Sequence, residues 1–314
     1  MNTSSYTSAS VFPLKLFDPA IIQSIKGGYI PPVHLQLNPT NRCNLKCKFC
    51  SCANKDDHEM SYDQAKDILE RFKKLGTKAI TLTGGGEPLC HPSINAIIAY
   101  CNMLGIEVGL VSNGVLLDSL DESLDIRWCR ISLSGSNTLS KKIYNKIKSM
   151  PHVDWAFSYV LKAHDYSNIT NCITLANDLN VTHIRIVDDI LSEEESKISH
   201  AREIIEAHGI DTSRVIWQGR KTYTHGTKSC LISLLKPSID AHGNVYPCCG
   251  AQYSDKEPSL DYSGKFNMGS DYEALWKNQS NFDGSVCYRC FYSDYNNLLN
   301  AIVDSKSIEH RLFV

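Results

Sequence analysis

The sequence predicts an α/β fold, an open partial barrel of parallel strands followed by a small cysteine-rich domain. Strand and helix patterns alternate six times between residues 33 and 208, as in parallel strands joined by crossover helices. Six units, where a closed barrel has eight, predict an open one. From about residue 211 the chain becomes rich in Gly, Ser, Tyr and Cys, which marks a domain boundary.

Within the barrel, the hydrophobic patterns define each element in turn. The expected strands occupy residues 33–37, 79–83, 106–111, 128–133, 153–161 and 183–187. The expected helices occupy residues 61–75, 91–104, 114–124, 136–149, 167–179 and 192–208. Ser61 and Gly76 should begin and end the first helix, and three consecutive glutamates suit the positive end of the last helix dipole.

The domain organisation follows from punctuation and composition. We expect a polar, peripheral leader at residues 1–30, the barrel at 31–210 and an auxiliary domain at 211–314. The leader ends in a glycine pair, and the Pro31-Pro32 pair opens the barrel. A turn at residues 240–244, between apolar runs, predicts a β-hairpin in the auxiliary domain.

Composition excludes several classes of protein. The chain has 314 residues with 42% hydrophobic and 21% charged residues, and its net charge of -2 gives no basic field for nucleic acid. No apolar run approaches the roughly 18 residues of a membrane span, and the polar N-terminus lacks a secretory signal pattern. We therefore expect a cytoplasmic location, where the 13 cysteines serve metal or redox chemistry.

Three cysteines set close together carry the strongest chemical signal. Cys43, Cys47 and Cys50 follow the first expected strand with C-x3-C-x2-C spacing. Three thiolates can hold three irons of a 4Fe–4S cluster and leave the fourth iron open to a substrate or cofactor. A zinc site is the alternative, although zinc prefers four ligands in two pairs.

Glycines and small polar residues follow the next three strands. The segments are Thr83 to Pro88, with three glycines and Glu87, then Ser112-Asn113-Gly114, and then Ser132 to Gly135. Each alone is typical of a turn or a helix cap. Because the ends of parallel strands meet at one edge, the segments and the cysteine loop together outline one pocket.

Four more cysteines are spread over the C-terminal part. Cys230 would be brought near Cys248 by the hairpin, and Cys287 and Cys290 form a C-x2-C pair. Four cysteines can hold either zinc or a fully ligated 4Fe–4S cluster, and the spacing leaves both open. Cys249 is an alternative to its neighbour Cys248.

The motifs, in this order, resemble the radical S-adenosylmethionine (SAM) superfamily over about residues 33 to 208. The resemblance implies a TIM-like partial (β/α)6 barrel whose cluster binds SAM through its open iron. Reductive cleavage of SAM would give a 5′-deoxyadenosyl radical, which abstracts a substrate hydrogen. The cofactor-binding residues that it implies are Phe49, Gly84, Gly85, Gly86, Glu87, Ser112, Asn113, Ser132 and Ser134. Ser134 stands where many relatives have an acidic residue.

The C-terminal part resembles a Twitch domain, the short relative of the SPASM domain. The resemblance implies one auxiliary 4Fe–4S cluster held by Cys230, Cys248, Cys287 and Cys290, with Cys248 preferred over Cys249. No cysteine follows Cys290, whereas the longer SPASM pattern needs more. A fully ligated cluster suits electron transfer, and a purely structural role is the alternative.

These features predict a radical SAM oxidoreductase. We expect a two-electron oxidation or bond formation on a small polar substrate, such as a sugar alcohol, nucleoside or nucleotide, with the auxiliary cluster as electron acceptor. A flavodoxin- or ferredoxin-type protein would supply electrons. The alternatives are a redox-neutral isomerase or epimerase in which Cys90 or Cys172 returns the hydrogen, a peptide (RiPP) maturase, and a non-catalytic iron–sulfur or zinc protein.

Some single residues remain to be placed. Arg185 is the candidate catalytic residue, meeting either the SAM carboxylate or the substrate, and a salt bridge with a neighbouring aspartate is the alternative. The remaining cysteines are expected to be buried apolar residues of the core, namely Cys52, Cys90, Cys101, Cys129 and Cys172.

Overall fold

The strands form one curved, open sheet. The computed structural model describes residues 18–135, 140–161, 166–192, 196–219, 225–251, 264–287 and 290–304. Within them, the nine-stranded sheet has the order β7-β6-β5-β4-β3-β2-β1-β8-β9. Neighbours are parallel except for the hairpin pair β8 and β9. The strands are β1 (His34–Leu37), β2 (Ala79–Leu82), β3 (Glu107–Ser112), β4 (Trp128–Ser132), β5 (Asp154–Leu161), β6 (His183–Asp188), β7 (Val215–Gln218), β8 (Ser238–Ile239) and β9 (Val245–Tyr246).

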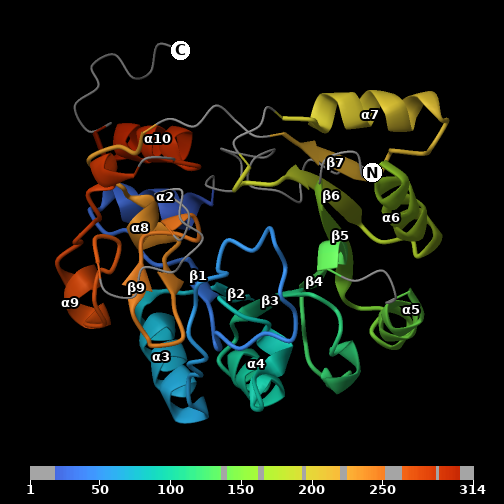
Figure 1. The fold of residues 1–314 in the computed structure, drawn as a ribbon. Coiled ribbons are helices and arrows are strands. Elements are labelled where there is room, and N and C mark those ends of the chain that lie inside the picture. Colours follow the sequence, from blue (N-terminus) through green and yellow to red (C-terminus); the bar gives the residue numbers. More distant parts are fainter. Residues whose placement is uncertain are drawn as a thin grey trace.

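Helices cover the outer side of this sheet, as Figure 1 shows for α3 to α7. The helices α2, α8, α9 and α10 gather near the edge formed by β8 and β9. The bounds are α2 (Pro19–Lys26), α3 (Tyr62–Leu75), α4 (Ile94–Met103), α5 (Ser140–Ser149), α6 (Tyr166–Asp178), α7 (Ile198–Ala207), α8 (Ile232–Leu235), α9 (Tyr272–Lys277) and α10 (Ser293–Asp304). None of the described helices has the length and apolar character needed to span a bilayer.

The two faces of each strand have different surroundings. In β4, Cys129 and Ile131 are fully buried beneath the helices. Trp128, Arg130 and Ser132 alternate with them, are half-buried and face the inside of the barrel. We call this inner space, lined by the inward residues of β1 to β6, the lumen. The core therefore lies between the sheet and the helices, and polar side chains are free to line the lumen.

The predicted barrel is confirmed in its main elements. All six expected strands form, and α3 to α7 follow the strands as the alternation predicts. The hydroxyl of Ser61 accepts a hydrogen bond from Gln64 N at 3.1 Å, and α3 ends at Gly76 with φ 114°. The helix expected from residue 192 begins only at Ile198, and the glutamates at 193–195 lie outside the described residues.

The prediction of a helix over residues 114–124 is wrong. Only a short 3-10 helix, Leu117–Ser119, forms there. Gly114 has φ 79°, which turns the chain after β3, and the loop then buries Leu117 and Leu120 against the core. The Lys146 side chain donates to the Leu120 carbonyl oxygen at 2.9 Å. Core packing by a loop therefore produced the apolar spacing that suggested a helix.

The expected domain limits stay predictions, but the structure describes what lies on either side of them. Residues 1–17 of the expected leader lie outside the described residues, and 19–26 form α2, which Asp18 caps and which buries Ile25. At the other limit, β7 pairs in parallel with β6, so the barrel sheet continues beyond residue 211. The hairpin β8–β9 also joins the same sheet through β1. One sheet thus spans both expected domains.

Gly109 on β3 makes room for a lumen side chain, and this can be tested. A Cβ atom at Gly109 would lie 2.2 Å from Cε2 of Trp128. We expect Gly109→Ala to destabilise the protein by about 1–3 kcal/mol, because the indole ring must leave its position. Urea unfolding of the reconstituted protein measures this. The exposed Glu107→Ala on the same strand is the control, and it should stay within about 0.5 kcal/mol of wild type. Equal stabilities of the two variants would contradict the account.

Candidate functional site

The cysteine loop is bound to the glycine segment through backbone atoms. Gly86 N donates to the Thr40 carbonyl oxygen at 3.0 Å, and Glu87 N donates to that of Arg42 at 2.9 Å. A Cβ atom at Gly86 would lie 2.0 Å from the Arg42 carbonyl oxygen. Gly86 is therefore required for close approach of the cysteine loop, and the cofactor contact that the resemblance implies for it stays a prediction.

The ends of the cysteine loop are also held together. Thr40 and Glu59 form an isolated antiparallel bridge, and Asn41 N donates to the His58 carbonyl oxygen at 2.8 Å. A turn inside the loop is closed by Cys50 N, which donates to the Cys47 carbonyl oxygen at 3.1 Å. The loop is thus a closed excursion at the carboxyl end of β1.

The three thiols of the loop differ in exposure. Cys43 is exposed, whereas Cys47 and Cys50 are half-buried. A hydrogen bond with the Cys52 thiol, helped by the charge of Lys55, lowers the pKa of Cys50 to about 6. The thiolate is the form that binds iron, so the donor set suits a cluster. Within the described ranges, no three His, Cys, Asp or Glu side chains are already arranged to hold a metal ion.

Glu87 organises the neighbouring strand ends. Its carboxylate is 3% exposed and accepts hydrogen bonds from Ser112 Oγ and Asn113 N, each at 2.7 Å, and from Leu89 N at 3.2 Å. Burial raises the pKa of Glu87. The Asn113 side chain in turn donates to Asn44 Oδ1 in the cysteine loop at 2.7 Å. Glu87 and Ser112 therefore position the site, and direct cofactor contact of these residues stays a prediction.

The remaining residues that were predicted to bind the cofactor lie around the same end of the lumen. Phe49 is half-buried in the cysteine loop, and Ser132 is half-buried at the end of β4. Ser134 Oγ accepts a hydrogen bond from Val160 N at 2.7 Å, so it joins β5 to the segment after β4. Gly84 faces its own segment, since a Cβ atom there would lie 2.3 Å from the Gly86 carbonyl oxygen. Gly85 is buried beside them.

Asn38, which sequence reasoning missed, faces the lumen directly after β1. Its side chain is 3% exposed, and its Oδ1 has no hydrogen-bond partner among the described residues. A buried acceptor without a donor costs free energy, so a bound group with a donor fits here. Its place in the inward alternation of β1 was the signal that could have identified it.

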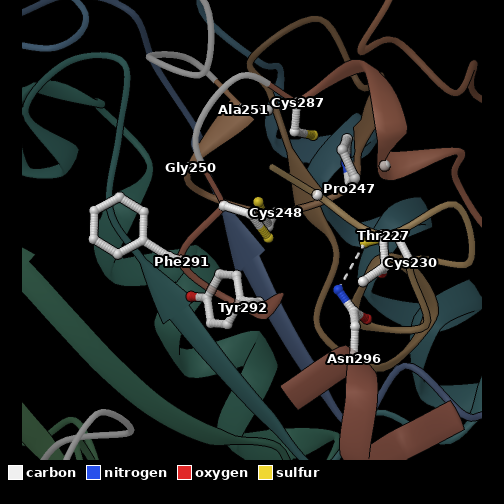
Figure 2. A pocket seen from close by; sticks show the side chains of 13 residues that line it. Thr227, Cys230, Pro247, Cys248, Gly250, Ala251, Cys287, Phe291, Tyr292 and Asn296 are labelled. Atoms are coloured by element: carbon white, nitrogen blue, oxygen red, sulfur yellow. Dashed lines mark hydrogen bonds between the residues drawn. The ribbon is translucent and has the colours of Figure 1, made fainter. Parts of the chain in front are cut away.

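The C-terminal cysteines surround one pocket, shown in Figure 2. Its empty volume is about 410 Å³, and its lining includes Cys230, Cys248, Cys287 and Cys290, whereas Cys249 is not part of it. The structure thus brings together the four cysteines that the sequence selected. They come from three separate segments, so only the tertiary fold assembles them.

Backbone contacts and one buried asparagine hold this pocket. Cys230 N donates to the Phe282 carbonyl oxygen at 3.0 Å. Asn296 on α10 accepts from Ile232 N at 3.0 Å and donates to Cys230 Sγ at 3.5 Å. Gly226 packs directly against the backbone at Gly284, since a Cβ atom added at Gly226 would lie 2.1 Å from the Gly284 carbonyl oxygen.

Burial favours the protonated form of three of the four thiols in this pocket. Burial raises the pKa of Cys230 to about 11 and that of Cys248 well above its ordinary value. Burial also raises the pKa of Cys290. Binding of a metal or an iron–sulfur cluster would stabilise the thiolates and release protons. The residues therefore fit such a group through the chemistry of their donors.

The two cysteine sites lie toward opposite ends of the lumen. The cysteine loop leaves the carboxyl end of β1. Strand β8 pairs in parallel with β1, and β9 returns antiparallel with Tyr246 opposite Ser238. Cys248, two residues beyond Tyr246, therefore lies toward the amino end of β1. At the carboxyl end of β1, the imidazole of His242 in the hairpin turn pairs with Asp56 of the cysteine loop at 2.7 Å.

Arg185, the candidate catalytic residue, lies on the inward face of β6. Its Nη2 donates to Gln218 Oε1 at 2.6 Å. Arg130 on β4 also faces the lumen, and sequence reasoning missed it. A charged residue within a mostly apolar parallel strand was the available signal, because such strands are buried on both faces in most α/β folds.

The other cysteines are placed as follows. Cys52, Cys101 and Cys129 are buried, as expected. Cys90 is only half-buried and accepts a hydrogen bond from the Asn44 backbone in the cysteine loop, so the expectation of a buried core residue is wrong for it. Cys172 is also only half-buried, on α6 at the outer side of the sheet, so the expectation of a buried residue is wrong for it as well, although it packs against the core.

Comparisons with known proteins agree with this geometry. The GTP 3',8-cyclase of Microcystis aeruginosa is 33% identical over 140 residues, which are 39% of this chain and 41% of that protein. The probable GTP 3',8-cyclase of Methanocaldococcus jannaschii is 33% identical over 138 residues, which are 42% and 46%. The chain thus matches less than half the length of these curated relatives.

Solved structures share the fold. SuiB of Streptococcus suis, bound to S-adenosylmethionine, superposes with a TM-score of 0.62 at 15% identity, covering 86% of this chain and 72% of that one. The enzyme anSMEcpe with bound AdoMet gives a TM-score of 0.54 at 15% identity, with 83% and 84% covered. The family model described as the Radical SAM superfamily matches residues 37–190. Residues 37–190 of the chain are thus similar to the radical SAM superfamily.

Proposed function

We propose that this protein is a radical SAM oxidoreductase with two iron–sulfur clusters, one at each cysteine site. The observation that carries the proposal is that one pocket gathers four cysteines, Cys230, Cys248, Cys287 and Cys290. This pocket lies toward one end of the lumen, and the cysteine loop lies at the other end. When bound, the first cluster and SAM supply a 5′-deoxyadenosyl radical and the second cluster supplies an electron acceptor. The protein binds and orients the reactants and excludes water.

The resemblance of the C-terminal cysteine pattern to a Twitch domain supports a 4Fe–4S site over a zinc site. The pocket lining supplies the four cysteines that either group would need. Full ligation by cysteine leaves no free iron, which suits electron transfer from a substrate radical.

The substrate would enter the lumen between the two sites. Relatives named GTP 3',8-cyclase support bond formation on a nucleotide. A sugar alcohol and a nucleoside are the other small polar candidates. SuiB, solved with its precursor peptide, keeps a peptide substrate as an alternative. A flavodoxin- or ferredoxin-type donor would deliver electrons.

The redox-neutral alternative needs a thiol that reaches the substrate. Cys172 lies on the outer side of the sheet, and Cys90 is bonded to the cysteine loop, so neither suits this role. Cys249 does: its Sγ lies 3.4 Å from the Tyr292 hydroxyl, and it is near enough to Arg130 for their charges to interact. This thiol is the specific observation that favours an isomerase.

Iron counting tests the first site. Anaerobic reconstitution should give about eight irons per chain in wild type and about four after alanine substitution of Cys43, Cys47 and Cys50. Cys172→Ala is the control and should keep the wild-type iron content. Formation of 5′-deoxyadenosine under dithionite should disappear in the triple variant alone. Wild type with iron but without SAM cleavage would overturn the proposed activity.

Adjacent cysteines give a matched test of the second site. Cys248→Ala should lose about four irons, because Cys248 lines the pocket, and Cys249→Ala should keep about eight. Iron analysis and Mössbauer spectra distinguish the two. Zinc bound in place of the second set of irons would reduce this site to a structural module, and equal iron loss in both variants would contradict the assignment of Cys248.

Glu87 should control SAM binding through the strand ends that it holds. In Glu87→Gln an amide donor replaces an acceptor oxygen opposite N–H groups, so we expect SAM affinity to fall roughly tenfold. Because burial raises the pKa of Glu87, this carboxylate becomes protonated at a higher pH than an exposed glutamate does. The SAM affinity of wild type should therefore fall as the pH is lowered through the pKa of Glu87. Calorimetric titration at several pH values measures both. The variant's affinity should not show this fall, and the exposed Glu122→Gln should match wild type throughout. Matching pH profiles for wild type and Glu87→Gln would rule the role out.

A further inference from the structure

Two arginines project into the lumen, one from β4 and one from β6, which lie on either side of β5. Arg130 on β4 lies opposite Ala156 of β5, and Arg185 on β6 lies opposite Ser158 of β5. All four residues alternate with buried apolar ones and share the inward face. Because β5 presents only small side chains between them, the two guanidinium groups border one common space.

Arg130 is held by an aromatic ring and lacks a charged partner. Its guanidinium carbon lies 5.7 Å from the centre of the Trp128 ring, which occupies the space left by Gly109. Among the described residues, Arg130 side-chain atoms form no hydrogen bond or ion pair with any carboxylate. The contact with Trp128 orients the guanidinium and leaves its N–H groups directed at other ligands.

The electrostatics of this space favour an anion. Burial, and then the charge of Arg185, lower the pKa of Arg130 to about 9. The inward residues level with the two arginines are neutral or basic, namely Val111, Ala156, His183, Ser132, Ser158 and Ile216. An anion bound there would relieve the repulsion between the guanidinium groups and supply acceptors for their N–H groups.

The pair spans two layers of the lumen. Arg185 is level with Ser132 through Ser158 of β5, so it borders the expected SAM site. Arg130 precedes Ser132 by one inward layer, so it lies deeper in the lumen, on the side of Cys249. Arg130 therefore stands between the two cysteine sites, where the proposed function places the substrate.

We propose that Arg130 and Arg185 bind a phosphate group of the substrate. This inference rests on the proposed function and deepens it, since it selects a phosphorylated compound such as a nucleotide over a neutral sugar alcohol. Two guanidinium groups match the charge and the oxygen geometry of a phosphate dianion better than a single carboxylate, for which one bidentate arginine suffices.

Titration with inorganic pyrophosphate tests the pair in anaerobically reconstituted protein. Arg130→Gln and Arg185→Gln should each weaken pyrophosphate binding by roughly 10- to 100-fold, because each removes charge-assisted hydrogen bonds. Arg127→Gln is the matched control. It lies at the start of the same strand but is exposed beside Asp154, and it should bind pyrophosphate as wild type does. SAM affinity should be the same in all four proteins.

Other outcomes overturn the inference. Pyrophosphate binding that is absent from wild type, or equal in wild type and Arg130→Gln, removes the phosphate site. If the arginine variants lose SAM affinity together with pyrophosphate affinity, the pair binds the SAM carboxylate. If wild type binds succinate as tightly as pyrophosphate, and the same variants lose succinate binding, the pair binds a carboxylate substrate. If Arg130→Gln fails to retain iron, Arg130→Lys is measured in its place. If Arg130→Lys binds pyrophosphate as tightly as wild type does, the result contradicts recognition of the phosphate by the paired N–H groups of the guanidinium.

A parallel assay separates this inference from the proposed function. Dithionite-reduced wild type is assayed for 5′-deoxyadenosine. Pyrophosphate binding without SAM cleavage supports the arginine pair and removes the proposed activity. SAM cleavage without pyrophosphate binding supports the activity and removes the arginine pair as a phosphate site.

Discussion

The backbone contact between Gly86 and Arg42 is the constraint on which the rest of the site depends. Any side chain at Gly86 would occupy the place of the Arg42 carbonyl oxygen. With that contact made, Glu87 N bonds the loop and the Glu87 carboxylate reaches the end of β3. Asn113 then returns to the loop at Asn44. The loop, the glycine segment and the third strand end therefore form a closed circuit of hydrogen bonds, and a change in one member shifts the others.

Strand β1 joins this circuit to the C-terminal pocket. Its carboxyl end leads into the cysteine loop, and its free edge receives β8, whose hairpin partner leads to Cys248. The pairing of His242 with Asp56 adds a second connection between the hairpin and the loop. Because a paired strand is stiff, the separation between the two cysteine sites is fixed by the sheet register.

Sequence reasoning succeeded where a local signal had one structural meaning. The caps of α3 at Ser61 and Gly76 and the strand ends are of this kind. It failed for residues 114–124 and for β7, since a buried loop can imitate helical spacing and a four-residue strand has too little pattern. Arg130 was missed because alternation along a strand does not tell which face lies against helices and which lines a lumen. That distinction exists only once the sheet has curved.

The lumen gathers polar groups that the protein itself does not satisfy. Among the described residues, Asn38 has a buried acceptor without a donor near the cysteine loop. Arg130 lies one layer below Ser132, is half-buried and makes no ion pair with a carboxylate of the described residues. On the outer surface the same side chains would be hydrated at no cost, whereas inside they oppose folding. A fold keeps such groups where a ligand restores their hydrogen bonds. Ligand binding should therefore stabilise this barrel through the lumen wall, and the pattern of unmet donors and acceptors describes the ligand: hydrogen-bond donors toward the SAM end and negative charge toward the C-terminal pocket.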